Sequence, residues 1–130
     1  MAIAPDTQMS PRPRTGRSVL IVDDHDAYRA AARWALEAGG YVVVGEAGNA
    51  TAGIEAARLL RPDVVLLDVC LPDRNGFAAA REIAEAAETG IVVLMSASPE
   101  SDFGDRVRTS RASGFIPKER LSARALEAFR

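Results

Sequence analysis

Short, uninterrupted aliphatic runs recur along the chain from residue 18 onward. Four strong runs and one weaker run lie at residues 19–22, 42–44, 64–67, 91–94 and 114–116. None of them alternates apolar with polar residues, as a strand with one solvent-facing side would. Strands buried on both faces are typical of a parallel sheet with helices between its strands. The pattern therefore predicts an α/β fold, (βα)5, with a doubly wound five-stranded parallel sheet.

Alanine-rich stretches separate these runs, at about residues 26–38, 50–60, 77–88, 101–111 and 120–130. Alanine has the highest helix propensity, so these stretches predict the intervening helices. In the first stretch, helical spacing places one apolar set on a single face: Ala27, Ala31, Trp34, Ala35 and Ala38. Gly39 and Gly40 predict the end of that helix, and Asn49 is the candidate N-cap of the next.

The composition is that of one ordinary globular domain. The chain has 130 residues, 48% of them hydrophobic and 26% charged, and a net charge of -2, which excludes a strongly basic nucleic-acid platform. Its apolar runs are far shorter than a membrane span, and its start lacks the apolar core of a secretory signal. With Cys70 as the only cysteine, we expect a cytoplasmic protein without an internal disulfide. Three of the seven prolines lie in residues 1–17, which predicts a flexible tail there and a single domain over 18–130.

Polar side chains stand where four of the five expected strands end. They are Asp23 and Asp24 after the first strand, Asp68 after the third, Ser96 after the fourth and Lys118 after the fifth. In an open α/β sheet the ligand site lies beyond the carboxyl ends of the strands. Lys118 is also the only lysine, beside fifteen arginines. We therefore expect these side chains to form the functional site.

Three carboxylates at one edge of a sheet repel each other, and a divalent cation resolves that conflict. Oxygen ligands without a cluster of His or Cys favour Mg²⁺ over Zn²⁺. Mg²⁺ leaves positions open for a phosphate oxygen, to which Ser96 can donate a hydrogen bond and whose charge Lys118 can neutralise. An aspartate can also be the nucleophile and form an aspartyl phosphate. Each residue has a structural interpretation as well, with the acids and the serine as cap or turn residues and His25 as the start of a helix.

Five short motifs carry a resemblance to a known family. They are VDDH at 22–25, PDVVLLD at 62–68, DVCLP at 68–72 with Gly76 beyond it, SA at 96–97 and GFIPK at 114–118. In this order the set resembles the receiver domain of two-component response regulators over about residues 17–130. It looks most like receivers that precede a helix-turn-helix domain in NarL/LuxR-type regulators. The resemblance implies a flavodoxin-like fold with strand order 2-1-3-4-5.

The resemblance also implies a role for each acid. Asp68 matches the phospho-acceptor, which attacks a phosphohistidine of a partner kinase. Asp24 matches the direct Mg²⁺ ligand and Asp23 the acid that reaches the ion through water. The backbone carbonyl of Cys70 matches the third protein ligand, so its side chain is free to vary.

Three further residues match the switch of the family. Ser96 matches the hydroxyl that follows the phosphoryl group, and Lys118 matches the cation that pairs with it. Phe115 matches the aromatic side chain that turns inward when that hydroxyl moves. The resemblance thus implies a phosphorylation-dependent shift of the face built by the fourth helix, the fifth strand and the fifth helix.

The expected function is a signalling switch whose only catalysis is its own Mg²⁺-dependent phosphorylation and dephosphorylation. The expected partner is a sensor histidine kinase or a phosphotransfer protein. A homodimer through the switch face or another face is a further option, and neither nucleic acid nor a membrane is expected to bind. One alternative is the receiver part of a longer DNA-binding transcriptional regulator. Another is a receiver-like binding module that no longer uses phosphate. A phosphatase of the haloacid-dehalogenase type needs a second aspartate two residues after its nucleophile, where this chain has Cys70.

Overall fold

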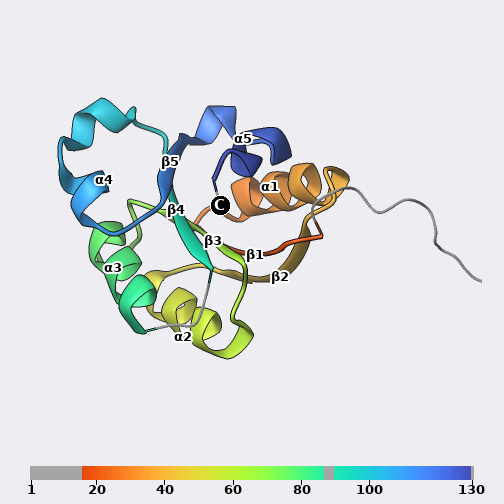
Figure 1. Ribbon diagram of the computed structural model, residues 1–130, viewed down its shortest axis with the longest axis horizontal. Helices are drawn as coiled ribbons and strands as arrows, with labels where there is room; N and C mark the ends of the chain where they lie inside the picture. The colour runs from red at the N-terminus through yellow and green to blue at the C-terminus, as the bar shows by residue number, and fades with distance from the viewer. Residues whose placement is uncertain (1–15, 87–89, 130) are drawn as a thin grey trace, which may run out of the picture.

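The computed structural model describes residues 16–86 and 90–129. Its strands and main helices alternate along the chain (Figure 1). They are β1 (Ser18–Val22), α1 (Asp26–Ala38), β2 (Val42–Ala47), α2 (Ala50–Leu60), β3 (Val64–Asp68), α3 (Gly76–Ala86), β4 (Ile91–Ser96), α4 (Arg106–Thr109), β5 (Gly114–Pro117) and α5 (Ala123–Glu127). Two short 3-10 helices, η1 (Glu100–Phe103) and η2 (Lys118–Arg120), precede α4 and α5.

The five strands form one parallel sheet in the order β2-β1-β3-β4-β5, which confirms the predicted fold and strand order. Helices α1 and α5 cover one face of the sheet, and α2 and α3 cover the other (Figure 1). The central strand β3 is buried at every residue, as its uninterrupted aliphatic run predicts. The order reverses between β1 and β3, so the carboxyl ends of these two strands flank the switch point where ligands bind in such sheets.

Strand β2 departs from the expectation that all strands are buried on both faces. It lies at the edge of the sheet, and its Val42 and Val44 are exposed. Helix α1 departs as well, because the face predicted from Ala27 and Trp34 is not the buried one. Trp34 is 76% exposed, whereas Ala32 and Leu36 enter the core. The alanines allow the helix to rotate, and the larger Leu36 side chain gains more from burial than the small alanine side chains would.

The last two helices are shorter than predicted. Over residues 101–111 the chain forms η1 and the four-residue α4, because Gly104 interrupts them with a positive φ of 58°. Over residues 120–130 the α-helix covers only Ala123–Glu127, since Ser122 caps it by accepting a hydrogen bond from the Ala125 N–H. The Asn49 N-cap of α2 is confirmed by its hydrogen bond from the Ala52 N–H, at 2.8 Å.

Residues 1–15 of the tail predicted over 1–17 lie outside the described residues. Gly16 and Arg17 already contact the domain, because the Gly16 N–H donates to the Gly40 carbonyl and the Arg17 carbonyl accepts from the Val42 N–H. Among the described residues, no helix has the length and apolar character to cross a membrane.

Candidate functional site

Four side chains converge at the carboxyl ends of β1 and β3. Asp23, Asp24, His25 and Asp68 each offer one ligand atom, and these atoms lie within 4.8 Å of one another. Asp23 is fully buried and Asp68 is 2% exposed, while Asp24 and His25 reach solvent. The three acids predicted from the sequence therefore lie together, at the strand ends that the topology brings side by side.

Lys118 reaches these acids from the end of β5. Its Nζ lies 2.5 Å from Asp23 Oδ2 and 3.0 Å from Asp68 Oδ2. The Asp68 contact is a hydrogen bond and the Asp23 contact is a short ion pair; apart from Lys118, no group among the described residues donates to Asp23 Oδ2. A buried carboxylate oxygen with one ionic neighbour retains coordination capacity for a further cation.

Burial and the neighbouring charges have opposing effects on the pKa values of both Asp68 and Lys118. Burial raises the pKa of Asp68, and this outweighs the hydrogen bonds from the Cys70 N–H and from Lys118 that favour the carboxylate. Burial alone would lower the pKa of Lys118, but its hydrogen bonds and charge attraction to Asp23 and Asp68 raise it. Lys118 is therefore a stable cation at neutral pH, held beside the predicted phospho-acceptor.

Tyr28 is a site residue that the sequence analysis missed. Lys118 Nζ lies 4.7 Å from the centroid of its ring, and its hydroxyl donates to the Lys118 carbonyl at 2.9 Å. Burial, followed by the charges of Asp23 and Asp68, raises the pKa of the phenol. One side chain on α1 thus fixes both the backbone and the ammonium group of the lysine. Ninety positions separate the two residues, and no local pattern links them.

His25 lies against the acid pair, closer than its expected role as a helix-start residue suggests. It is the N-cap residue of α1 but makes no side-chain cap bond. Its backbone N–H donates to Asp23 Oδ1 at 2.7 Å, and its Nδ1 lies 3.1 Å from that atom and 3.2 Å from Asp24 Oδ1. Asp23 and Asp24 therefore shape the loop before α1 rather than capping the helix.

Ser96 and Phe115 lie on the neighbouring strands β4 and β5. Ser96 is buried, and its Oγ accepts a hydrogen bond from the Ser98 N–H at 3.0 Å. This contact is the turn role that the sequence analysis gave as the structural interpretation of the serine. Phe115 is 8% exposed and therefore already points inward. Its ring centroid lies 5.9 Å from that of Phe103, which lies 5.4 Å from that of Phe77. This aromatic chain connects β5 through η1 to α3.

The loop after Asp68 is fixed by backbone contacts. The Cys70 N–H donates to Asp68 Oδ1 at 3.0 Å, and the Gly76 N–H donates to the Val69 carbonyl at 3.0 Å. A Cβ at Gly76 would lie 2.5 Å from the Asp68 carbonyl oxygen, so only glycine allows this close approach. The thiol of Cys70 is exposed.

Asp73 anchors the same loop to α2 and was also missed. Its carboxylate accepts from the Ala50 N–H at 2.8 Å, the Thr51 N–H at 2.9 Å and the Thr51 hydroxyl at 2.8 Å. These bonds lower the pKa of Asp73 to about 2, chiefly through the Thr51 N–H. The bonds from the Ala50 and Thr51 N–H groups satisfy two backbone donors at the start of α2, whereas Asn49 accepts only from the Ala52 N–H.

We expect Asp73→Asn to lower the melting temperature at pH 6, because it removes the charge and one acceptor from this cap. The folded pKa lies below the unfolded value of about 3.9, so the contribution is complete above pH 4 and is lost as the pH falls towards 2. The melting temperatures of the two proteins should therefore converge as the pH falls from 6 to 3. Asp102→Asn, which removes the same charge from an exposed position in η1, is the control. A gap between wild type and Asp73→Asn that widens at low pH would contradict this assignment.

The donor set fits a hard divalent cation. It consists of three carboxylates and the exposed His25 imidazole, and the buried oxygen Asp23 Oδ2 has no donor other than Lys118 among the described residues. Oxygen ligands of this kind are preferred by Mg²⁺. Lys118, the only lysine of the chain, forms ion pairs with both Asp23 and Asp68.

The comparisons with known proteins agree with this geometry. Residues 19–130 match the family model of the response regulator receiver domain. The transcriptional regulatory protein PdtaR of Mycobacterium tuberculosis is 39% identical over 102 residues, which cover 78% of this chain and 49% of that protein. The chemotaxis protein CheY of Thermotoga maritima is 32% identical over 113 residues, covering 87% and 94%. A solved LuxR-family response regulator from Aurantimonas sp. SI85-9A1 superposes with a TM-score of 0.77 and 29% identity, covering 86% and 81%. The chain spans about half the length of the transcriptional regulators it matches.

Proposed function

Because this chain belongs to the response regulator receiver domain family, we propose that Asp68 accepts a phosphoryl group from a phosphohistidine of a kinase or phosphotransfer protein. The observation that carries the proposal is that the Asp68 carboxylate is paired with Lys118 and lies in the same cluster as the acids Asp23 and Asp24. Receiver domains are signalling modules of two-component systems, and the phosphoryl group is the signal they carry.

The chemistry is a substitution at phosphorus. A carboxylate oxygen of Asp68 forms the new O–P bond as the N–P bond to the partner imidazole breaks, and the electron pair leaves with the imidazole nitrogen. Asp68 is oriented by the Cys70 N–H on one oxygen and by Lys118 on the other. Such a reaction depends on positioning and on charge stabilisation rather than on further covalent steps.

Asp23, Asp24, Asp68 and the backbone carbonyl of Cys70 would hold Mg²⁺ at this site. When bound, the ion screens the negative charge between the phosphoryl group and the attacking carboxylate. Lys118 supplies the second positive charge, since it is already paired with Asp68 before the reaction. The phosphoryl group of the product carries about 1.5 to 2 negative charges in place of the single carboxylate charge of Asp68, which gives Lys118 and the Ser96 hydroxyl a new partner.

The conformational change on phosphorylation would then be transmitted from Ser96 to Phe115 and, through the aromatic contact, to Phe103. The Ser96 Oγ accepts a hydrogen bond from the Ser98 N–H, and its own O–H can still donate to the phosphoryl group. The four-residue α4 is short and follows a glycine break, so it resists displacement less than a long helix would. The face formed by α4, β5 and α5 is the proposed output surface, and dimerisation through it belongs to the same proposal.

Titration of ¹⁵N-labelled protein with Mg²⁺ and then beryllofluoride, a phosphoryl mimic, tests this function. We expect Mg²⁺ to shift the amide signals of Asp24 and Cys70, and beryllofluoride then to shift those of Asp68, Ser96 and Phe115. Wild type without Mg²⁺ is the control, because the mimic needs the cation to bind the carboxylate. Mg²⁺-saturated protein whose Asp68 and Phe115 signals ignore beryllofluoride would instead favour a module that no longer uses phosphate.

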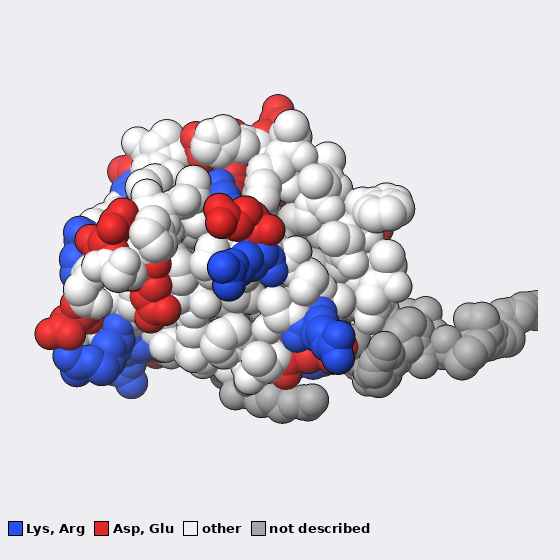
Figure 2. All heavy atoms as spheres, turned by 90° about the horizontal axis from the view of Figure 1, so that it is seen from above, with Lys and Arg blue, Asp and Glu red and all other residues white. Residues whose placement is uncertain are grey.

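The length of the relatives favours a second proposal, in which this receiver controls a transcriptional output. PdtaR is named a transcriptional regulatory protein and is about twice as long as the matched region. Acidic and basic side chains are interspersed over the face shown in Figure 2, without a continuous basic field on that face. We therefore assign any contact with DNA to a separate domain and not to this surface.

A further inference from the structure

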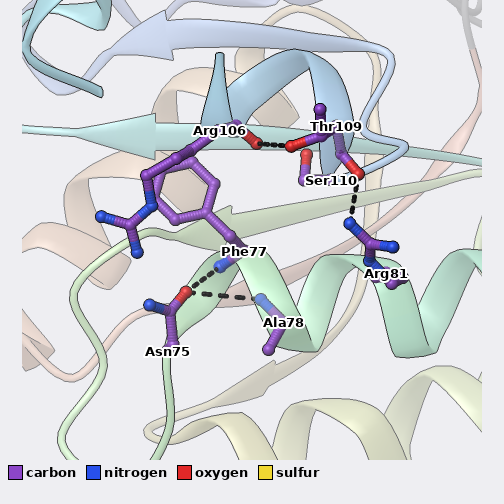
Figure 3. A pocket seen from close by; sticks show the side chains of 7 residues that line it. All are labelled: Asn75, Phe77, Ala78, Arg81, Arg106, Thr109 and Ser110. Carbon is purple, nitrogen blue, oxygen red and sulfur yellow. Dashed lines mark hydrogen bonds between the residues drawn. The ribbon is translucent and has the colours of Figure 1, made fainter. Parts of the chain in front are cut away.

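A cavity of about 330 Å³ lies between α3 and α4, away from the acids described above (Figure 3). Its wall contains two guanidinium groups, an amide, two hydroxyls and an aromatic ring, from Arg81, Arg106, Asn75, Thr109, Ser110 and Phe77. No carboxylate is among the residues that line it. The cavity therefore carries two formal positive charges that no acid in its own wall offsets.

Arg106 carries one of these charges and is exposed. Its guanidinium carbon lies 4.6 Å from the centroid of the Phe77 ring, and within residues 16–86 and 90–129 it forms no ion pair. Two neighbouring arginines outside the wall do form ion pairs, since Arg74 pairs with Glu82 and Arg108 pairs with Asp105. Stacking on a ring fixes the plane of the guanidinium and leaves its N–H donors free at the edges.

Two further donors face the same space. Arg81 donates through Nη2 to the Thr109 carbonyl at 2.6 Å, which ties α3 to the end of α4 and leaves its other N–H groups available. Asn75 uses its Oδ1 as the cap of α3, accepting from the Phe77 N–H at 2.7 Å, so its amide NH₂ group remains a donor. Figure 3 shows the Arg106 guanidinium projecting past the Phe77 ring towards the Asn75 side chain.

We propose that this cavity between α3 and α4 binds an oxyanion, with Arg106 and Arg81 as its cationic partners and Asn75 as a neutral donor. A planar guanidinium beside an amide donor matches the oxygens of a carboxylate or a phosphate group. The source is either a free anion or an acidic side chain of a partner protein, and both present the same chemistry. The proposal does not depend on phosphorylation of Asp68.

Two probes separate these sources: inorganic phosphate, and an acetylated and amidated tetraglutamate peptide. Each is titrated into ¹⁵N-labelled full-length chain without Mg²⁺, against sodium chloride of equal ionic strength. We expect saturable shifts of the Phe77, Thr109 and Ser110 amide signals, with an affinity about tenfold weaker in Arg106→Gln. Binding of phosphate indicates a free anion, and binding of the peptide alone indicates an acidic partner.

Arg108→Gln is the matched control, because Arg108 lies on the same short helix but is paired with Asp105 and exposed. It should bind the probes as wild type does. Arg106→Lys, which keeps the charge and loses the planar donor group, should fall between wild type and Arg106→Gln. Shifts that sodium chloride reproduces, or an affinity that Arg106→Gln leaves unchanged, would overturn the proposal.

Discussion

Asp68→Asn is expected to abolish covalent phosphorylation by acetyl phosphate, which supplies a phosphoryl group without a kinase. The amide has nearly the same size and keeps an oxygen that can accept from the Cys70 N–H, but it is no nucleophile. Lys118 keeps its ion pair with Asp23, so the site retains its shape. Incorporation of label in the presence of Mg²⁺ should fall to background, a loss larger than any other single substitution would cause.

The control for this experiment is Asp102→Asn, which removes one carboxylate from an exposed position outside the site. It should be labelled at the wild-type rate. Circular dichroism of both variants establishes that they are folded, which excludes unfolding as the cause of a lost signal. Retained Mg²⁺-dependent, base-labile label in Asp68→Asn would show that another residue is the acceptor.

The sequence predicts the sheet well because each strand is a short run of aliphatic residues, as strands buried on both faces require. That pattern does not distinguish a central strand from an edge strand, which explains why the exposure of Val42 and Val44 in β2 was not foreseen. Alanine-rich helices pose a related difficulty, since small side chains mark no face strongly. The apolar face assigned to α1 was wrong for this reason, and Leu36 rather than Trp34 enters the core.

The acids of the site could be predicted because topology alone brings strand ends together. Tyr28 and Asp73 could not, because each acts on a residue distant in the sequence. Asp73 caps a helix that begins 23 positions before it, through the Ala50 N–H. This contact forms because α2 packs beside the β3–α3 loop, and a spacing pattern along the sequence does not predict that packing.

Lys118→Arg should impair the switch although it preserves the charge. The ammonium group occupies a narrow position, 2.5 Å from Asp23 Oδ2, 3.0 Å from Asp68 Oδ2 and 4.7 Å from the centroid of the Tyr28 ring. A planar guanidinium is larger and needs a fixed fork geometry, so it must lose the ring or one carboxylate. We expect labelling of Asp68 by acetyl phosphate to slow at least about tenfold, with loss of the beryllofluoride shift at Phe115.

Arg124→Lys, the reverse exchange at an exposed position in α5, is the matched control and should leave labelling unchanged. Lys118→Met separates charge from shape, because it leaves the buried carboxylates Asp23 and Asp68 without their cation. That variant should be less stable than wild type in the absence of Mg²⁺ and should regain part of this stability when Mg²⁺ is added. If Lys118→Arg switches normally, shape at this position does not matter, and the single lysine among fifteen arginines is a coincidence of composition. Impaired switching would instead mean that the site itself requires the one residue whose positive charge is compact enough to lie between two carboxylates and a ring.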